Sequence, residues 1–183
     1  MDLGAIRHRL QSDSYVLAEP FAFLSLWARN VRGAGDPHFG RLARERIELG
    51  IAAELAVLGW EKRRVGHEWS DRVVHVSAQY PGACFDIQSV TLDGPRTEPR
   101  FIEVKAVAPD SFEFHWSRAE VEAAQLLDVR YFLYLVPIQP AGVPDVSAIE
   151  LIQNPYSAVY ENPQGWHKAE ADIVCRKRKS PVS

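Results

Sequence analysis

Two opposite charges alternate with apolar residues in the stretch from residue 101 to residue 107. Its β-branched and aromatic residues, with turn formers on both sides, predict a strand. Because a strand sends alternate side chains to opposite faces, Ile102 and Val104 share an apolar face suited to a core. Glu103 and Lys105 share the other face. They form either a plain ion pair on a half-solvated sheet or a catalytic pair beside a metal ion.

Asp86 is a second acid in an element that otherwise looks apolar. It lies within residues 83–90, which have the pattern of a strand. Strong turn chemistry in residues 92–99 predicts a hairpin between this strand and the next. The two strands should therefore be antiparallel neighbours, which can bring Asp86 close to Glu103.

A third acid, Glu54, belongs to a helix expected over residues 40–58, with Gly59 as its C-cap. At about 100° per residue, Glu54 falls inside the apolar arc of this helix. A carboxylate there needs a buried Arg or Lys, a strand end to cap, or a cation. The arc expected to face the core consists of Ile47, Ile51, Leu55 and Leu58.

One divalent cation would account for all these acids together. Mg²⁺ takes oxygen ligands from one or two carboxylates, from water and from substrate phosphate, and Mn²⁺ is the alternative ion. Asp86 and Glu103 would supply the carboxylates, and Lys105 would orient or activate the attacking water. Glu54 would act through water or hold a second ion. The competing interpretation is a structural ion-pair network, in which loss of Lys105 strongly destabilises the fold.

These residues resemble the D…ExK signature of the PD-(D/E)xK nuclease superfamily, with Asp86 followed by Glu103-Val104-Lys105. The preceding helix with Glu54 is similar to the acidic helix of that superfamily. The resemblance implies a restriction-endonuclease-like α/β (α+β) core, with a central mixed sheet flanked by helices. It also implies a metal site in which the backbone carbonyl of Val104 is a further ligand.

A longer set of motifs resembles the NO VEIN C-terminal domain, a member of this superfamily often attached to larger ATPase or helicase-like proteins. Cys84 stands where members usually have Gly, and Ala106 stands where Ser or Thr is common; losing that polar group would weaken a substrate contact. The resemblance covers about residues 40 to 160. Its motifs are residues 83–87, 101–105, 112–114, Ser117-x-x-Glu120, 131–136 and 152–155.

The remaining elements follow from local patterns. Ser117 and Glu120 form a capping box, which explains Glu120 and starts a helix through about residue 128. Residues 130–138 are almost wholly apolar and predict a central strand covered on both faces. A helix between two strands indicates a crossover connection. Further strands are expected near residues 63–69, 72–78, 146–152 and 166–175.

The length of 183 residues suits one main domain, here residues 39–183. Residues 1–38 form an N-terminal segment expected to be helical. Its apolar cluster, residues 21–28, should pack on the main domain or on a partner.

The formal net charge of −3 gives no support to a broad nucleic-acid surface. Cys84 and Cys175 fit neither a zinc nor a disulfide pattern, and no apolar run is long enough to span a bilayer. These features predict a cytoplasmic protein without a membrane partner. The basic tail, residues 176–179, is expected to be a solvated end.

The sequence therefore predicts a Mg²⁺-dependent nuclease that acts on DNA, in restriction or phage defence, with a homodimer as one arrangement. Gln88, on the Asp86 face of its strand, could touch substrate. The alternative is a non-catalytic module that binds nucleic acid or recruits a protein within a larger ATPase- or helicase-containing system. His67, His75 and His115 are expected to have surface or packing roles.

Overall fold

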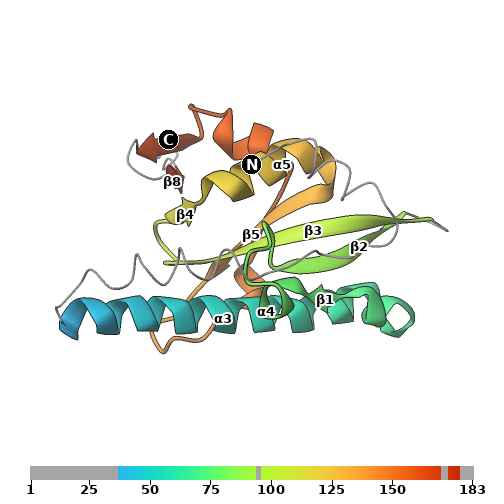
Figure 1. Ribbon diagram of the computed structural model, residues 1–183, viewed down its shortest axis with the longest axis horizontal. Helices are drawn as coiled ribbons and strands as arrows, with labels where there is room; N and C mark the ends of the chain where they lie inside the picture. Colours follow the sequence, from blue (N-terminus) through green and yellow to red (C-terminus); the bar gives the residue numbers. More distant parts are fainter. Residues whose placement is uncertain (1–36, 94–95, 170–172, 178–183) are drawn as a thin grey trace, which may run out of the picture.

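The computed structural model describes residues 37–93, 96–169 and 173–177. The expectation of a helical segment at 1–38 lies outside these residues, apart from its last two positions. Those two begin the long helix α3 (Pro37–Val65), which runs along one side of the molecule (Figure 1).

A five-stranded mixed sheet forms the centre of the fold. Its strands are β1 (Val74–His75), β2 (Ile87–Asp93), β3 (Arg96–Val107), β5 (Tyr131–Pro137) and β6 (Glu150–Gln153), in the order β1-β2-β3-β5-β6. Only β3 and β5 are parallel; every other pair of neighbours is antiparallel. The predicted mixed α/β core with flanking helices is confirmed.

Helix α5 (Arg118–Leu127) makes the crossover from β3 to β5. It starts at the predicted capping box: the Ser117 hydroxyl accepts from the Glu120 N–H, and the Glu120 carboxylate accepts from the Ser117 N–H. The helix turns Val121, Ala124 and Leu127 into the core. All seven residues of β5 are buried, as expected for a central strand.

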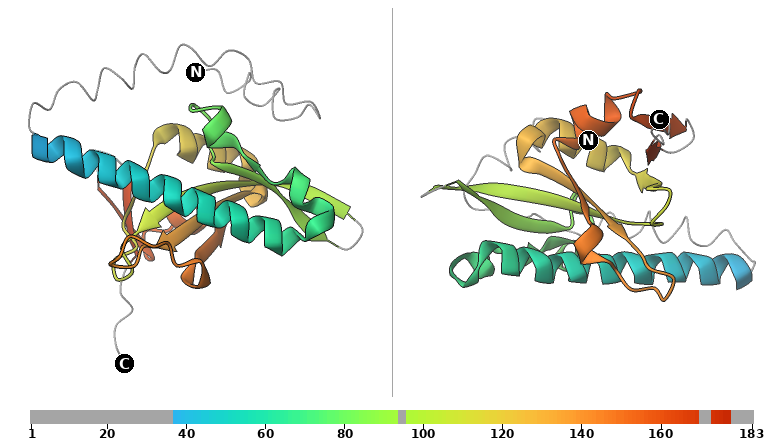
Figure 2. Two further views of the ribbon diagram at one scale, coloured as in Figure 1. Left: turned by 90° about the horizontal axis from the view of Figure 1, so that it is seen from below. Right: turned by 180° about the vertical axis from the view of Figure 1, so that it is seen from behind.

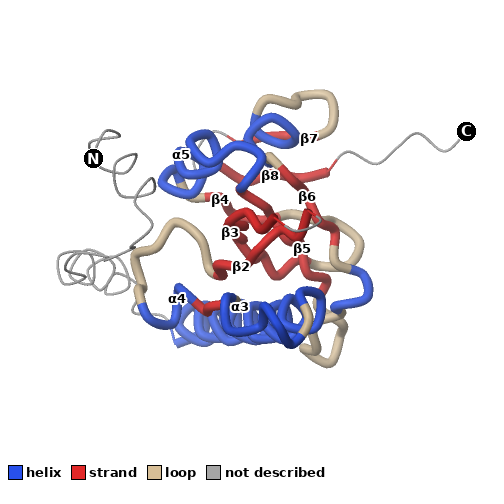
Figure 3. The backbone as a smooth tube through the Cα atoms, turned by 90° about the vertical axis from the view of Figure 1, so that its right-hand side faces the viewer, coloured by secondary structure: helices blue, strands red, loops and turns tan. Residues whose placement is uncertain are grey.

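Layers on both faces cover this sheet (Figures 2 and 3). Helix α3 packs on one face, against Ile102 and Val104 of β3. Helix α5 packs on the other face, together with a small second sheet. That sheet has the order β4-β8-β7 and consists of β4 (Phe114–Trp116), β7 (Trp166–Ala169) and β8 (Ile173–Lys177).

The predicted C-cap of the long helix is wrong. Gly59 lies inside α3, which continues to Val65 because Val57, Glu61 and Val65 are buried against the sheet and hold the last turns in place. The residue that follows the helix is Gly66, whose φ of 78° is the left-handed conformation that glycine adopts readily.

The predicted inward stripe of α3 is also wrong for three of its four residues, whereas Leu58 is partly buried and packs against the core as predicted. Ile47, Ile51 and Leu55 are 45%, 49% and 53% exposed. The sheet instead contacts a row that lies further round the helix. This buried row consists of Ala53, Val57, Glu61 and Val65.

Four expected strands differ from the structure. Residues 63–69 form the end of α3 and the start of the 3-10 helix η2 (His67–Arg72). Within residues 72–78 only Val74–His75 is a strand, named β1, because the chain then turns into α4 (Val76–Gln79). Residues 146–152 are divided between η4 (Val146–Ala148) and β6. The expected strand 166–175 is two strands, β7 and β8, because both pair in the second sheet. No helix among the described residues is long and apolar enough to cross a membrane.

Candidate active site

Asp86 lies directly before β2, so the prediction that it belongs to the strand is wrong by one residue. Its backbone is fixed nonetheless. The Asp86 N–H donates to Ile102 O at 2.8 Å, and its carbonyl accepts from the N–H of Val76 at 2.7 Å. Asp86 Oδ2 accepts from the Val104 N–H at 2.8 Å. Because Ile87 pairs with Ile102, the next step of the register places Asp86 opposite Glu103, as predicted.

Glu103 and Lys105 share the β3 face that points to α5. The Lys105 ammonium lies 2.5 Å from Glu103 Oε1 and 2.7 Å from Glu120 Oε2. Glu120 accepts from the N-cap Ser117 through the same oxygen. The capping box therefore also aims a carboxylate at Lys105, and Glu120 has two roles where the sequence suggested one.

Glu54 reaches the same place from α3, on the opposite side of the sheet. Its Oε2 is 2.7 Å from His75 Nε2 and accepts from Ser77 Oγ at 2.6 Å. Its charge is one of the causes that raise the pKa of Asp86, so the two carboxylates lie close to each other. Glu54 on one face of the sheet and Glu103 on the other therefore both lie near Asp86, the residue that precedes β2.

The charges of this acid cluster, defined as Glu54, Asp86, Glu103 and Glu120, are unbalanced. Burial and the neighbouring charge of Glu54 raise the pKa of Asp86 to about 7. Burial also raises the pKa of Glu103, with Asp86 and Glu120 adding to the shift and Lys105 opposing it. Burial alone would lower the pKa of Lys105, but Glu103 and Glu120 raise it instead. The cluster therefore contains an excess of acids over its one fixed cation, Lys105, and the raised pKa values of Asp86 and Glu103 reflect this excess.

This excess and the oxygen donors fit a hard divalent cation, which would neutralise it. The described residues contain no preformed group of three or more His, Cys, Asp or Glu side chains that could hold a metal. A Mg²⁺ site does not require one, because water and substrate phosphate complete its shell. The Val104 N–H points to Asp86, and since the N–H and C=O of one strand residue share a side, its carbonyl points the same way.

Gln88 is half-buried in β2 and pairs with Phe101 of β3. Because Phe101 and Glu103 point to the same face of the sheet, Gln88 lies on that face too. The structure therefore brings together Glu54, Asp86, Glu103, Lys105 and the Val104 backbone, with Gln88 nearby on the same face. His67 and His115 are exposed.

Sequence reasoning missed His75 and Ser77 as partners of Glu54. Neither has a spacing signal, because the turn from β1 into α4 brings them to Glu54. For Glu120, the combination of a capping box and a nearby E-x-K strand was a usable signal.

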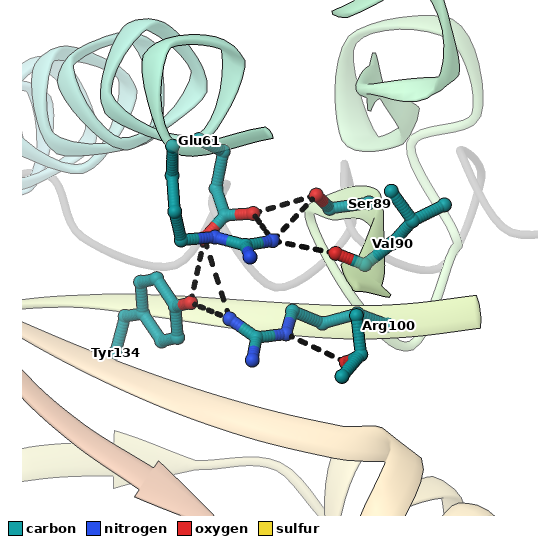
Figure 4. A network of polar contacts seen from close by, with 7 residues as sticks. Glu61, Ser89, Val90, Arg100 and Tyr134 are labelled. Atoms are coloured by element: carbon teal, nitrogen blue, oxygen red, sulfur yellow. Dashed lines mark hydrogen bonds and ion pairs between the residues drawn. The ribbon is translucent and has the colours of Figure 1, made fainter. Parts of the chain in front are cut away.

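A second buried carboxylate, Glu61, lies on the α3 side of the sheet (Figure 4). Its oxygens accept from Ser89 Oγ at 2.6 Å and from Tyr134 Oη at 2.7 Å. Arg64 donates to both oxygens, at 2.9 and 2.7 Å, and Arg100 lies 3.6 Å away. Burial alone would raise the pKa of Glu61, but hydrogen bonds from Arg64, Ser89 and Tyr134 outweigh burial and lower it.

Comparison with known proteins assigns part of the chain to a family. The family described as Protein NO VEIN, C-terminal, matches residues 53–149, which is more than half of the chain. No curated protein and no solved structure matches. The matched range runs from the middle of α3 through β2, β3, α5 and β5, and it contains the whole acid cluster. The chain belongs to the NO VEIN C-terminal family.

Proposed function

We propose that the protein is a Mg²⁺-dependent nuclease, with Mn²⁺ as the alternative ion, that hydrolyses phosphodiester bonds of DNA. The observation that carries the proposal is the unbalanced acid cluster with Lys105 at its edge. The family match and the resemblance of Asp86 and Glu103-Val104-Lys105 to the PD-(D/E)xK signature support it. Restriction or phage defence is the setting that we propose.

Each residue has a distinct part in this proposal. Asp86 and Glu103 would hold the ion together with the Val104 carbonyl, and Glu54 would bind through water. When bound, a divalent ion stabilises charge on phosphate oxygens and makes a bound water more acidic. The fixed contact between Asp86 and the Val104 N–H keeps that carboxylate in position for its ligand.

Lys105 is held by two carboxylates, so its ammonium stays charged and fixed. A fixed cation can orient a water molecule or stabilise developing phosphate charge, but a lysine with a raised pKa is a poor general base. We therefore assign Lys105 to positioning and charge stabilisation. Gln88 is proposed as a substrate contact.

The test is cleavage of supercoiled plasmid and of single-stranded DNA with Mg²⁺ or Mn²⁺. Asp86→Asn, Glu103→Gln and Lys105→Ala should each abolish cleavage, whereas Asp93→Asn should cleave like the wild type. Asp93 is a matched control because it lies at the other end of β2 and is exposed. Equal cleavage by all five proteins would identify a contaminant and end the proposal.

One observation favours a second candidate, a non-catalytic module that binds nucleic acid or recruits an ATPase or helicase partner. Lys105 already gives Glu103 and Glu120 an internal counter-charge, so part of the cluster is satisfied without an ion. Calorimetric titration with Mn²⁺ separates the candidates. Binding that Glu103→Gln abolishes supports the nuclease, and no binding by a folded wild type supports the module.

A dimer is a further part of the nuclease proposal, because cutting both strands of a duplex calls for two sites. Sedimentation of the protein with a DNA duplex and Ca²⁺ in place of Mg²⁺ checks it. A complex with two protein chains per duplex is expected, and a single chain per duplex would remove this part.

A further inference from the structure

Three aliphatic side chains of α3 form an exposed line that we call the α3 stripe. It consists of Ile47, Ile51 and Leu55, which follow one another at i, i+4 and i+8 and are 45%, 49% and 53% exposed. Residues four apart lie above one another on a helix, so the three side chains form one contiguous apolar surface. Single exposed aliphatic residues are ordinary, whereas an aligned run of three forms one apolar patch that a short apolar segment can cover.

The α3 stripe borders the acid cluster. Glu54 is three residues after Ile51 and next to Leu55, and Leu58 continues the line as a half-buried residue. The buried row Ala53, Val57 and Glu61 lies further round the helix, against the sheet. Whatever covers the stripe would therefore lie along the side of α3 that leads to Glu54.

The size of the α3 stripe argues against a second copy of the chain as its occupant. Three half-exposed aliphatic side chains offer at most a few hundred Å². A stable interface buries about 800 Å² on each partner. A tethered segment of the same chain needs less area, because its effective concentration is in the millimolar range.

The chain contains a suitable segment. Residues 21–28 read Phe-Ala-Phe-Leu-Ser-Leu-Trp-Ala, and residues 29–36 connect them to the start of α3. Ile47 lies ten residues into α3, about 15 Å along its axis, and eight extended residues span about 26 Å or more. The connector can therefore return the segment to the stripe. An eight-residue helix is about 12 Å long, which equals the rise from Ile47 to Leu55.

We infer that residues 21–28 pack against the α3 stripe within the same molecule and cover the side of α3 next to Glu54. Segment and surface match in apolar character, in length and in the reach of the connector. The inference does not depend on nuclease activity, since both surfaces exist whether or not the acid cluster binds a metal.

Hydrogen–deuterium exchange of the full-length chain tests the contact. Amides of residues 21–28 should exchange at least about tenfold more slowly than in a synthetic peptide of residues 15–36. The double variant Ile51→Asp/Leu55→Asp should remove this protection. The matched control is Val129→Asp/Val143→Asp, which changes two residues of similar exposure (55% and 58%) outside the stripe and should leave the protection intact.

A second variant, changed in the segment and not in the stripe, keeps the inference testable if the stripe variant misfolds. Phe23→Ser/Trp27→Ser changes no described residue, and it should increase hydroxyl-radical labelling of Ile51 and Leu55 at least about threefold. Exchange of residues 21–28 at the peptide's rate in the wild type would overturn the inference. So would protection that survives both variants, or protection that disappears on dilution as a dimer dissociates.

Discussion

Two buried carboxylate sites occupy opposite faces of the same sheet and have opposite electrostatics. Glu61 accepts from Arg64, Ser89 and Tyr134, and its pKa is lowered. Asp86 and Glu103 lie among other carboxylates with Lys105 as their fixed cation, and their pKa values are raised. Burial disfavours the charged form in both places, so the difference comes from the neighbours.

The comparison separates a structural charge from a functional candidate. A fully paired buried carboxylate contributes to stability only while its partners remain. An under-neutralised cluster costs stability, so a reason outside folding is needed to retain it. The structural ion-pair interpretation therefore describes the Glu61 network well, whereas within the acid cluster it accounts only for the pairs that Lys105 makes with Glu103 and Glu120.

The largest expected effect is on stability at Glu61. Glu61→Gln removes the charge that faces Arg64 and Arg100, and it should lower the free energy of unfolding by about 3 kcal/mol. Urea unfolding measures it. The control Glu122→Gln breaks the exposed pair with Arg118 and should change stability by less than about 0.5 kcal/mol. Equal effects of the two variants would contradict the structural role of Glu61.

Asp86→Asn should have the opposite effect to Glu61→Gln: it should reduce cleavage activity without reducing stability. The amide oxygen can still accept from the Val104 N–H, but the charge that would hold a cation is gone. Plasmid cleavage should fall by about 100-fold or more, while the free energy of unfolding stays equal or rises. A loss of stability as large as that of Glu61→Gln would assign Asp86 a structural role, and the acid cluster would then not differ in role from the Glu61 network.

The two sites should also show opposite pH dependence. The pKa of Asp86 is raised from 3.8 to about 7, so between these values the folded state binds more protons than the unfolded state. Stability of the metal-free wild type should fall by about 4 kcal/mol relative to Asp86→Asn as pH rises from 4 to 8. Glu61, with its lowered pKa, contributes stability that is lost as pH falls below about 4.5. Urea unfolding in a chelating buffer follows both trends, and parallel curves for wild type and Asp86→Asn would contradict the first.

A smaller effect is expected at His75, which acts through Glu54. His75 Nε2 and Ser77 Oγ both contact Glu54 Oε2, and together they fix the orientation of the Glu54 carboxylate. His75→Ala should weaken Mn²⁺ binding by about tenfold in calorimetry. His75→Gln should restore part of it, and the exposed control His67→Ala should bind like the wild type. Unchanged affinity in His75→Ala would show that Glu54 needs no fixed orientation.

Local patterns predicted much of the site. The alternation along residues 101–107 predicted which face carries Glu103 and Lys105, and the turn residues before it predicted the neighbouring antiparallel strand. The capping box at Ser117 predicted the start of α5. These features depend on neighbours in the chain, whose geometry the backbone fixes within a few residues.

The sequence by itself determined the strand that carries the E-x-K pair, the helix that crosses to β5 and the three acids that needed an explanation. Only the tertiary structure decided which side of α3 is buried, because that depends on where the sheet lies beneath the helix. Ile47, Ile51 and Leu55 form the more hydrophobic row, yet the sheet packs on Ala53, Val57 and Glu61. The same packing decided that Glu61 is neutralised by arginines while Asp86 is surrounded by acids. Partners that are distant in sequence set the energy of a buried charge, and no local pattern reports them.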